Sequence, residues 1–374
     1  MKYIDAFRDA DHAQTLKTAI ANTVQPHRHY RLMEFCGGHT HTIHRYGIPS
    51  LLPSEVELIH GPGCPVCVLP IGRIDKAILL ASMPEVILCS YGDMLRIPGS
   101  KQQSLLQAKA RGADVRMVYS VDDALSIAID NPNKEVVFFA IGFETTTPPT
   151  ASIIKQAATQ NLTNFSVFCN HVLTPVAMDS LLRTQSDALN PPQLDGFIGP
   201  AHVSIIIGSK AYETVSQTYQ KPIVIAGFEP VDVLHAILML IEQINSNRCE
   251  VENQYTRAVT HEGNRQSQAM MAEVFELRPS FEWRGLGLIP NSALQIQSAF
   301  KSFDAEQRFT LPDTQGMEHK HCDCGAILRG MKKPTECQLF ASVCTPENPL
   351  GSCMVSSEGA CAAMYTYGRM STPL

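Results

Sequence analysis

Short apolar segments alternate with helical patterns along the chain from Arg31 to about Asn245. Most of these segments are rich in β-branched or aromatic residues and end at a glycine, which is typical of buried parallel strands. Eight strands are predicted in this way: Arg31–Phe35, Val56–His60, Val86–Cys89, Val115–Tyr119, Val136–Ile141, Phe165–Cys169, Gly196–Ile198 and Pro222–Ala226. The alternation of strands and helices indicates an α/β fold with parallel sheets.

Helices are predicted from capping patterns, a glycine at the C-terminal end, or a 3.6-residue apolar period. They cover Ala6 to Val24, Gln102–Arg111, Ala124–Ile129 and the residues after Pro230. A unit of one strand, one loop with glycine or polar residues, and one helix recurs in both halves of this region. This internal repeat predicts two similar α/β domains, at residues 31–133 and 134–245.

The pattern changes after residue 246, where apolar periodicity weakens and proline, glycine, cysteine and charged residues become more frequent. Residues 246–374 are therefore predicted to form a loop-rich third domain that is held together by metal. The helical segment at residues 1–30 is expected to pack on this third domain.

Composition is that of an ordinary globular protein, with 44% apolar and 18% charged residues. The net charge of −6 argues against a general nucleic-acid binder, which needs a basic surface. No run of about 18 apolar residues exists, so no membrane-spanning helix is predicted. The N-terminus carries charges where a signal peptide needs an apolar run, and we therefore expect a cytoplasmic protein.

Cysteine and histidine are frequent, with 12 and 13 residues in a chain of 374. The cytoplasm keeps thiols reduced, so these cysteines indicate metal binding or redox chemistry rather than structural disulfides. Six of the cysteines crowd into the C-terminal segment: Cys322, Cys324, Cys337, Cys344, Cys353 and Cys361.

The spacing Cys324-x12-Cys337-x6-Cys344-x16-Cys361 gives a set of four thiolates. Tetrahedral zinc and an iron–sulfur cluster both accept such a set. Zinc sites usually contain Cys-x2–4-Cys pairs, whereas the only close pair here, Cys322 and Cys324, is separated by one residue. The wide spacing favours an iron–sulfur cluster, with zinc and unliganded cysteines as the alternatives.

A second cysteine motif, Gly61-Pro-Gly-Cys64-Pro-Val-Cys67, directly follows a predicted strand. A Cys-x-x-Cys pair in this position is typical of a thiol–disulfide redox site. A helix that starts near Cys64 would favour the thiolate through its dipole. The alternative is half of a zinc knuckle, but the sequence has no second Cys-x-x-Cys to complete it.

A third motif, Cys36-Gly-Gly-His39-Thr-His41, also follows a predicted strand. A thiol beside imidazoles suits iron or zinc, so Cys36 and His39 are candidate site residues. His41 and His44 are more typical of a helix face. Loops at the carboxyl ends of parallel strands share one side of their sheet. The same side is therefore expected to carry Cys36, Cys64, Cys67, Asp93, Glu144, His171, His202 and Glu229.

These motifs closely resemble the HypD family, the iron–sulfur maturation factors of [NiFe]-hydrogenases. The matching strings are CGGHTH at 36–41, HGPGCPVCVLPIGRID at 60–75, LLQAKARGADVRMVYS at 105–120, GFETT at 142–146, GFEP at 227–230, VENQY at 251–255, EWRGLG at 282–287 and MVSSEGACAA at 354–363. The resemblance covers essentially the whole chain. It implies two related α/β domains and a cluster domain.

The resemblance also implies a function. The family is an assembly scaffold, rather than a conventional turnover enzyme, for the Fe(CN)2CO unit of the hydrogenase active site. It works with a small HypC-type chaperone and with a HypE-type protein that presents cyanide as a C-terminal thiocyanate. The resemblance implies that the hydrogenase large-subunit precursor is an indirect partner. No nucleic-acid or membrane partner is expected.

The resemblance also implies roles for individual residues. Cys36 corresponds to the thiolate that binds the iron carrying CN and CO, shared with a cysteine of the chaperone. Cys64 and Cys67 correspond to the redox pair. The [4Fe-4S] ligands correspond to Cys324, Cys337, Cys344 and Cys361, whereas Cys322 and Cys353 receive no role. The alternative function is an iron–sulfur disulfide reductase of the ferredoxin–thioredoxin reductase type.

Overall fold

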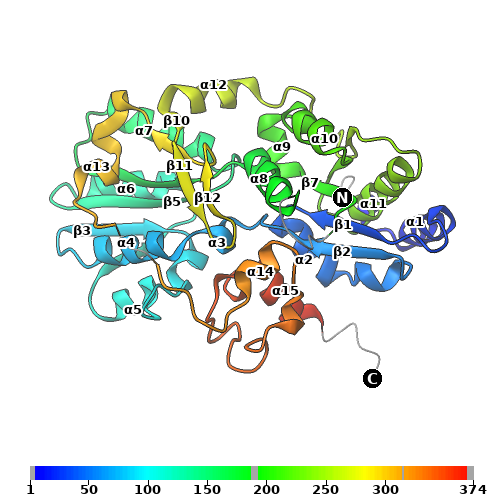
Figure 1. Ribbon diagram of the computed structural model, residues 1–374. Coiled ribbons are helices and arrows are strands. Elements are labelled where there is room, and N and C mark those ends of the chain that lie inside the picture. Colours follow the sequence, from blue (N-terminus) through cyan, green and yellow to red (C-terminus); the bar gives the residue numbers. More distant parts are fainter. Residues whose placement is uncertain (1–4, 187–192, 314–315, 369–374) are drawn as a thin grey trace.

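The computed structural model describes residues 5–186, 193–313 and 316–368, and two parallel sheets lie at its centre (Figure 1). The strand order is β2-β1-β7-β8-β9 in the first sheet and β4-β3-β5-β6 in the second. The strands are β1 Tyr30–Glu34, β2 Val56–His60, β3 Val86–Ser90, β4 Asp114–Met117, β5 Glu135–Gly142, β6 Phe165–His171, β7 Gly196–Pro200, β8 Ile223–Ala226 and β9 Val251–Asn253. Every pairing in these two sheets is parallel.

The predicted α/β class and all eight predicted strands are confirmed. Strands β3, β6, β7 and β8 are buried along their whole length, and β5 is buried after Glu135, which explains why their sequences are largely apolar. The helices are α1 Ala10–Thr23, α2 Gly37–Arg45, α3 Pro65–Val68, α4 Ile71–Ala81, α5 Leu105–Ala110, α6 Val121–Asp130, α7 Thr147–Thr159, α8 Thr174–Ser186, α9 Ala201–Ile207, α10 Glu213–Tyr219, α11 Pro230–Asn245, α12 Arg265–Val274, α13 Ala305–Arg308, α14 Cys324–Leu328 and α15 Ala360–Tyr367. Among the described residues, no helix has both the length and the apolar character needed to cross a bilayer.

The strand pairing corrects the predicted division at residues 133/134. The chain builds β1 and β2, crosses to the second sheet for β3 to β6, and returns to the first sheet for β7 to β9. The boundary predicted at 133/134 therefore runs through the middle of the second sheet, between β4 and β5. Strand pairing depends on contacts between distant segments, and the local strand–helix pattern contains no information about them.

The N-terminal helix also packs differently from the prediction. Helix α1 lies against α11 on the first sheet (Figure 1), and its buried Leu16 and Ile20 join the apolar cluster of that sheet. The Asn245 side chain fixes the contact, because its amide donates to the Thr23 carbonyl at 2.7 Å and its Oδ1 accepts from Tyr30 Oη at 2.6 Å. Helix α1 thus completes the core of the first sheet instead of covering the cysteine-rich segment.

Residues 246–374, predicted as one domain, divide between two places. Strand β9 extends the first sheet, while α12, α13 and two short antiparallel strand pairs pack on the second sheet. Those pairs join β10 Phe275–Leu277 with β13 Leu294–Ile296, and β11 Ser280–Trp283 with β12 Gly287–Pro290. The six clustered cysteines lie in the remaining segment, 316–368, which forms a layer below both sheets (Figure 1, orange to red). The largest apolar cluster of the protein continues into this layer through Ile327, Leu328 and Met354.

Candidate functional site

Cys36 occupies the turn between β1 and α2, where the first sheet ends. It is the N-cap residue of α2 and is only 1% exposed. Its Sγ lies 3.4 Å from Nδ1 of His202, which belongs to α9 after strand β7. Burial raises the pKa of the Cys36 thiol well above its usual value, and the charges of Glu358 and Glu34 add to this effect. Binding of a metal at Cys36 therefore requires the thiol to lose a proton that the site otherwise retains.

Glu34 lies directly beneath this turn and is 1% exposed. Its carboxylate accepts hydrogen bonds from the main-chain N–H of Cys36 at 2.8 Å, from the Thr40 hydroxyl, and from His60 Nδ1 at 2.8 Å. His60 Nε2 in turn lies 2.9 Å from His44 Nε2. One buried carboxylate thus ties the Cys36 turn to the end of β2, from which the Cys64 motif departs.

His39 is fully buried on α2, and the structure separates it from the thiol. Its Nε2 is 3.0 Å from the carbonyl oxygens of both Ala226 and Gly227, so Nε2 carries the proton and donates. Burial lowers the pKa of His39, which keeps the ring neutral, and its Nδ1 has no hydrogen-bond partner among the described residues. The ring of Phe228 packs against both His39 and His202, with centroid distances of 4.9 and 5.4 Å. The imidazole that contacts Cys36 is therefore His202, not His39.

Cys64 and Cys67 bracket the start of α3 and are joined by a disulfide. Cys64 is the N-cap residue of this helix, as the sequence predicts, and its Sγ accepts from the Cys67 N–H at 3.2 Å. The loop before it packs against the Cys36 turn, since the Gly37 N–H donates to the Gly63 carbonyl at 3.0 Å. A Cβ at Gly63 would overlap with the main chain of Phe35 and Cys36, so glycine is required for this close approach.

A cleft of about 590 Å³ opens between the two sheets above these cysteines. Loops that follow β2, β3, β4, β5 and β7 line it, which confirms that loops from both sheets gather at one side. Its lining residues include Gly63, Pro65, Asp93, Tyr119, Thr145, His202 and Glu358. Ser356 to Glu358 come from the cysteine-rich layer, so all three parts of the protein meet at this cleft.

The remaining residues predicted at the strand ends have structural partners. Glu144 is buried and accepts from the N–H and the hydroxyl of Thr174, both at 2.9 Å, and so fixes the start of α8. Glu229 accepts from Arg8 at 2.9 Å and caps α11. His171 is buried, with Nε2 at 3.1 Å from the Thr150 hydroxyl. These three residues stabilise the loops around the cleft.

The six C-terminal cysteines line one common cavity, together with Ile327, Leu339, Phe340 and Met354. The four cysteines chosen from spacing lie in it, and so do Cys322 and Cys353. Sγ of Cys324 is 2.6 Å from Sγ of Cys353. The pKa of Cys324 is lowered well below its usual value, first by hydrogen bonds from Cys322 and Cys353 and also by the charge of Arg284.

The donor set of this cavity suits a cluster better than a single ion. Within residues 5–186, 193–313 and 316–368, no three His, Cys, Asp or Glu side chains converge closely enough to hold one metal ion. A cubane takes each thiolate at a different iron, so its ligands are more widely separated. Five buried cysteines and the partly exposed Cys322 surround this apolar cavity and fit that requirement, and Cys324, Cys337, Cys344 and Cys361 would hold such a cluster.

The cysteine cavity is in direct contact with the Cys64–Cys67 loop. The Ser352 hydroxyl donates to the Cys67 carbonyl at 2.9 Å and lies 3.6 Å from Sγ of Cys324. Arg284, at the turn of the β11–β12 hairpin, donates from its main chain to the Val68 carbonyl at 2.7 Å. Sequence reasoning missed both residues, and it also missed Glu34. The sequence signal for Glu34 was a carboxylate that follows the apolar pair Leu32 and Met33 in a predicted strand.

Comparison with known proteins agrees with these features. A sequence model of the HypD family, described as the hydrogenase formation hypA family, matches residues 11–368. The "Hydrogenase expression/formation protein HupD" of Azotobacter chroococcum mcd 1 is 64% identical over 369 residues, which cover 99% of this chain and 97% of that protein. The "Hydrogenase maturation factor HypD" of Cupriavidus necator is 61% identical over 371 residues, covering 99% and 98%.

A more distant relative matches over the same extent. The "Hydrogenase maturation factor HypD" of Escherichia coli K12 is 45% identical over 372 residues, which cover 98% of each chain. Identity at this level along nearly the full length of both proteins leaves no part of the fold unmatched. The chain therefore belongs to the HypD family.

Proposed function

We propose that this protein is a hydrogenase maturation factor and serves as the scaffold on which the Fe(CN)2CO unit of [NiFe]-hydrogenase is assembled. Its cargo is the iron that carries CN and CO. Its resident cofactor is a [4Fe-4S] cluster held by Cys324, Cys337, Cys344 and Cys361. Its partners are a small HypC-type chaperone and a HypE-type donor of cyanide.

One observation carries this proposal: three sulfur sites form a continuous path through the protein. The Cys36 turn is hydrogen-bonded to Gly63, the residue before Cys64. Cys64 is joined to Cys67, and the Cys67 carbonyl accepts from Ser352 beside Cys324. This order places a dithiol that can donate two electrons between the thiol proposed to bind iron and the proposed cluster site. Such an arrangement suits a redox step performed on bound iron.

Cys36 is the residue proposed to hold the cargo iron. Burial lowers the pKa of His202 to about 4, so the imidazole is an uncharged hydrogen-bonding partner beside the Cys36 thiol. Soft thiolate suits a low-spin iron that carries strong-field cyanide. One thiolate cannot hold such an iron alone, and the second protein ligand is assigned to the chaperone.

The Cys64–Cys67 pair supplies the electrons for release of cyanide. A protein thiocyanate and the dithiol give a protein thiol, the Cys64–Cys67 disulfide, cyanide and one proton. The two electrons leave the dithiol as its S–S bond forms, and they cleave the S–CN bond. The cluster, when bound, supplies single electrons that return the disulfide to the dithiol. The cleft of about 590 Å³ is lined by Gly63 and Pro65 and gives an extended thiocyanate tail access to this pair.

An iron–sulfur disulfide reductase of the ferredoxin–thioredoxin reductase type is the alternative. The contact between Ser352, Cys67 and Cys324 favours it as well, because such an enzyme also places a cluster beside a dithiol. It has no use for Cys36, whose buried thiol lies against His202. The Cys36 turn therefore favours the scaffold.

Infrared spectroscopy of the protein purified together with its small partner separates the two functions. The scaffold requires cyanide and CO stretching bands in the complex. If the complex contains iron and the cluster, reduces disulfides, and shows neither type of band, the reductase function is correct.

A further inference from the structure

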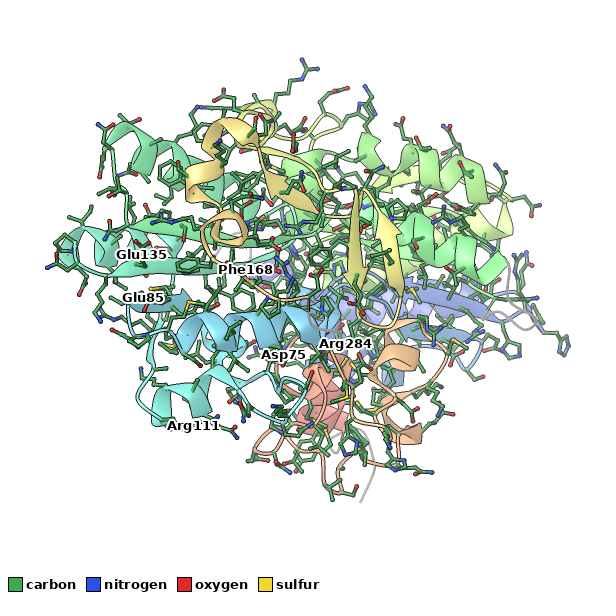
Figure 2. All side chains as sticks on the ribbon, turned by 60° about the vertical axis from the view of Figure 1, so that its left-hand side comes forward. Asp75, Glu85, Arg111, Glu135, Phe168 and Arg284 are labelled. Atoms are coloured by element: carbon green, nitrogen blue, oxygen red, sulfur yellow. A yellow bond between two sulfur atoms is a disulfide. The ribbon has the colours of Figure 1, made fainter. Side chains whose placement is uncertain are left out.

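Arg284 lies at the turn of the β11–β12 hairpin, close to the cysteine-rich layer (Figure 2). The turn also contacts residues 64–69, which carry Cys64 and Cys67 and are called the dithiol loop below. It is only 4% exposed. Its main-chain N–H donates to the Val68 carbonyl at 2.7 Å, and its Nε donates to the Leu69 carbonyl at 3.1 Å. Val68 and Leu69 directly follow Cys67, so Arg284 binds the C-terminal end of the dithiol loop.

The next residue in the hairpin packs on the cysteine cavity. Gly285 adopts a φ of +82°, and a Cβ there would lie 2.7 Å from Cα of Gly325, the neighbour of Cys324. Only glycine permits this approach and this backbone conformation. This contact holds the hairpin turn that carries Arg284 against the Cys324 end of the cavity, and the positive charge of Arg284 helps to lower the pKa of the Cys324 thiol.

The guanidinium lacks a sufficient partner among the described residues. Nη2 of Arg284 is buried and makes no hydrogen bond. The nearest carboxylate, Glu318, is 3.6 Å away from Nε, and its side chain is 44% exposed. A buried cation with an unused N–H is costly unless an anion lies beside it. Four thiolates and their cluster carry a net negative charge and would supply that anion.

We propose that Arg284 is a positioning residue that docks the dithiol loop on the cluster site and raises the reduction potential of the cluster held there. The proposal rests on the function proposed above. A cation stabilises the more negative, reduced form of a cluster, and hydrogen bonds to its sulfurs act in the same direction. Arg284 thereby makes the cluster easier to reduce while keeping it next to the disulfide that it serves.

The test is a redox titration of the full-length protein, followed by the visible and electron paramagnetic resonance signals of its cluster. Arg284→Gln removes the charge, and Arg284→Lys keeps it. The matched control is Arg278→Gln, because Arg278 is also a largely buried arginine but pairs with Glu306. Arg284→Gln should lower the ratio of reduced to oxidised cluster at least tenfold at a fixed ambient potential, or ~59 mV for one electron. Arg284→Lys should stay within threefold of the unaltered protein, and so should Arg278→Gln.

Each other outcome has a definite meaning. An intact cluster with an unchanged potential in Arg284→Gln overturns this inference and leaves the proposed function standing. An equal shift in Arg278→Gln also overturns it. If Arg284→Gln loses the cluster, retention in Arg284→Lys supports the role of the charge, whereas loss in both variants overturns it. A protein that never shows cluster signals, even unaltered, overturns both this inference and the proposed function.

Discussion

The thiol of Cys36 and the imidazole of His202 lie 3.4 Å apart, although 166 positions separate them in the chain. Strands β1 and β7 are adjacent and parallel, so the turns at their carboxyl ends meet. The pair thus places a buried thiol against a neutral imidazole at the edge of the first sheet.

Cys36→Ala should leave the [4Fe-4S] absorption intact and remove the cyanide and CO bands of the complex. His202→Phe keeps the aromatic stacking on Phe228 but removes the ring nitrogen that contacts the thiol, so these bands should develop more slowly. His39→Ala should weaken the bands without erasing them, because His39 does not reach the thiol. Infrared spectra of the co-purified complexes measure all three effects. Bands of full strength in Cys36→Ala would move the iron to Cys64 or Cys67.

Cysteines of the C-terminal cavity should fall into two classes. Alanine at Cys324, Cys337, Cys344 or Cys361 should abolish the absorption of the cluster and loosen residues 316–368, since metal binding supplies folding free energy there. Alanine at Cys322 or Cys353 should leave the absorption, and these two variants are the matched controls because both residues line the same cavity. Iron and sulfide content, measured together with visible spectra, tests this division into ligands and non-ligands. Loss in Cys322→Ala but not in Cys324→Ala would reverse the choice of ligand.

The Cys64–Cys67 disulfide should form and break reversibly. Cys64→Ser and Cys67→Ser should each prevent it and still retain the cluster. Differential alkylation with mass spectrometry, performed before and after reduction, measures the disulfide directly. Cys89→Ser is a suitable control, because Cys89 is buried in β3 away from the dithiol. Absence of the disulfide under oxidation would favour a purely metal-binding role for the pair.

Glu144 should make stability depend on pH. Burial raises its pKa from 4.5 to about 7, so the folded state retains a proton that the unfolded state releases. The contribution of this retained proton to the free energy of unfolding is fully present below about pH 4.5 and is lost as the pH rises through 7. Glu144→Gln stays neutral, so its stability relative to the unaltered protein should rise by roughly 3 kcal/mol between pH 5 and pH 8. Urea unfolding at several pH values tests this, and parallel pH profiles for the two proteins would contradict it. The buried histidines lose stability as the pH falls, but they are common to both proteins and cancel.

Arg73 of α4 and Glu306 of α13 form a largely buried ion pair beside β6. Arg73 also donates to the Cys169 carbonyl at 2.8 Å and stacks over Phe168 at 4.1 Å. Arg73→Met should therefore destabilise the protein by about 3 kcal/mol in urea unfolding. Arg116→Met, which breaks the more exposed pair with Asp114, should cost less than about 1 kcal/mol. Equal losses in the two variants would show that burial of the Arg73 pair is unimportant.

The sequence by itself determined the local structure. Most of the eight strands could be predicted because they are short, largely apolar segments whose burial is encoded in their own residues. Helix α6 could be predicted because Ser120 and Asp123 form a capping box, which the structure contains. The sequence also singled out Cys36, the Cys64–Cys67 pair and the C-terminal cysteines. Cysteine is a rare residue, and the spacing between cysteines indicates the type of site that they form.

Only the tertiary structure decided which segments meet. The sheet partners of β1, the packing of α1 on α11, and the contacts of His202, Ser352 and Arg284 all join residues far apart in the chain. Such contacts follow from the burial of whole faces of sheets and helices, a collective property that no local pattern expresses. Arg284 illustrates the point. An arginine after a tryptophan carries no local signal of burial, and its role depends on the carbonyls of Val68 and Leu69, which the fold brings to it.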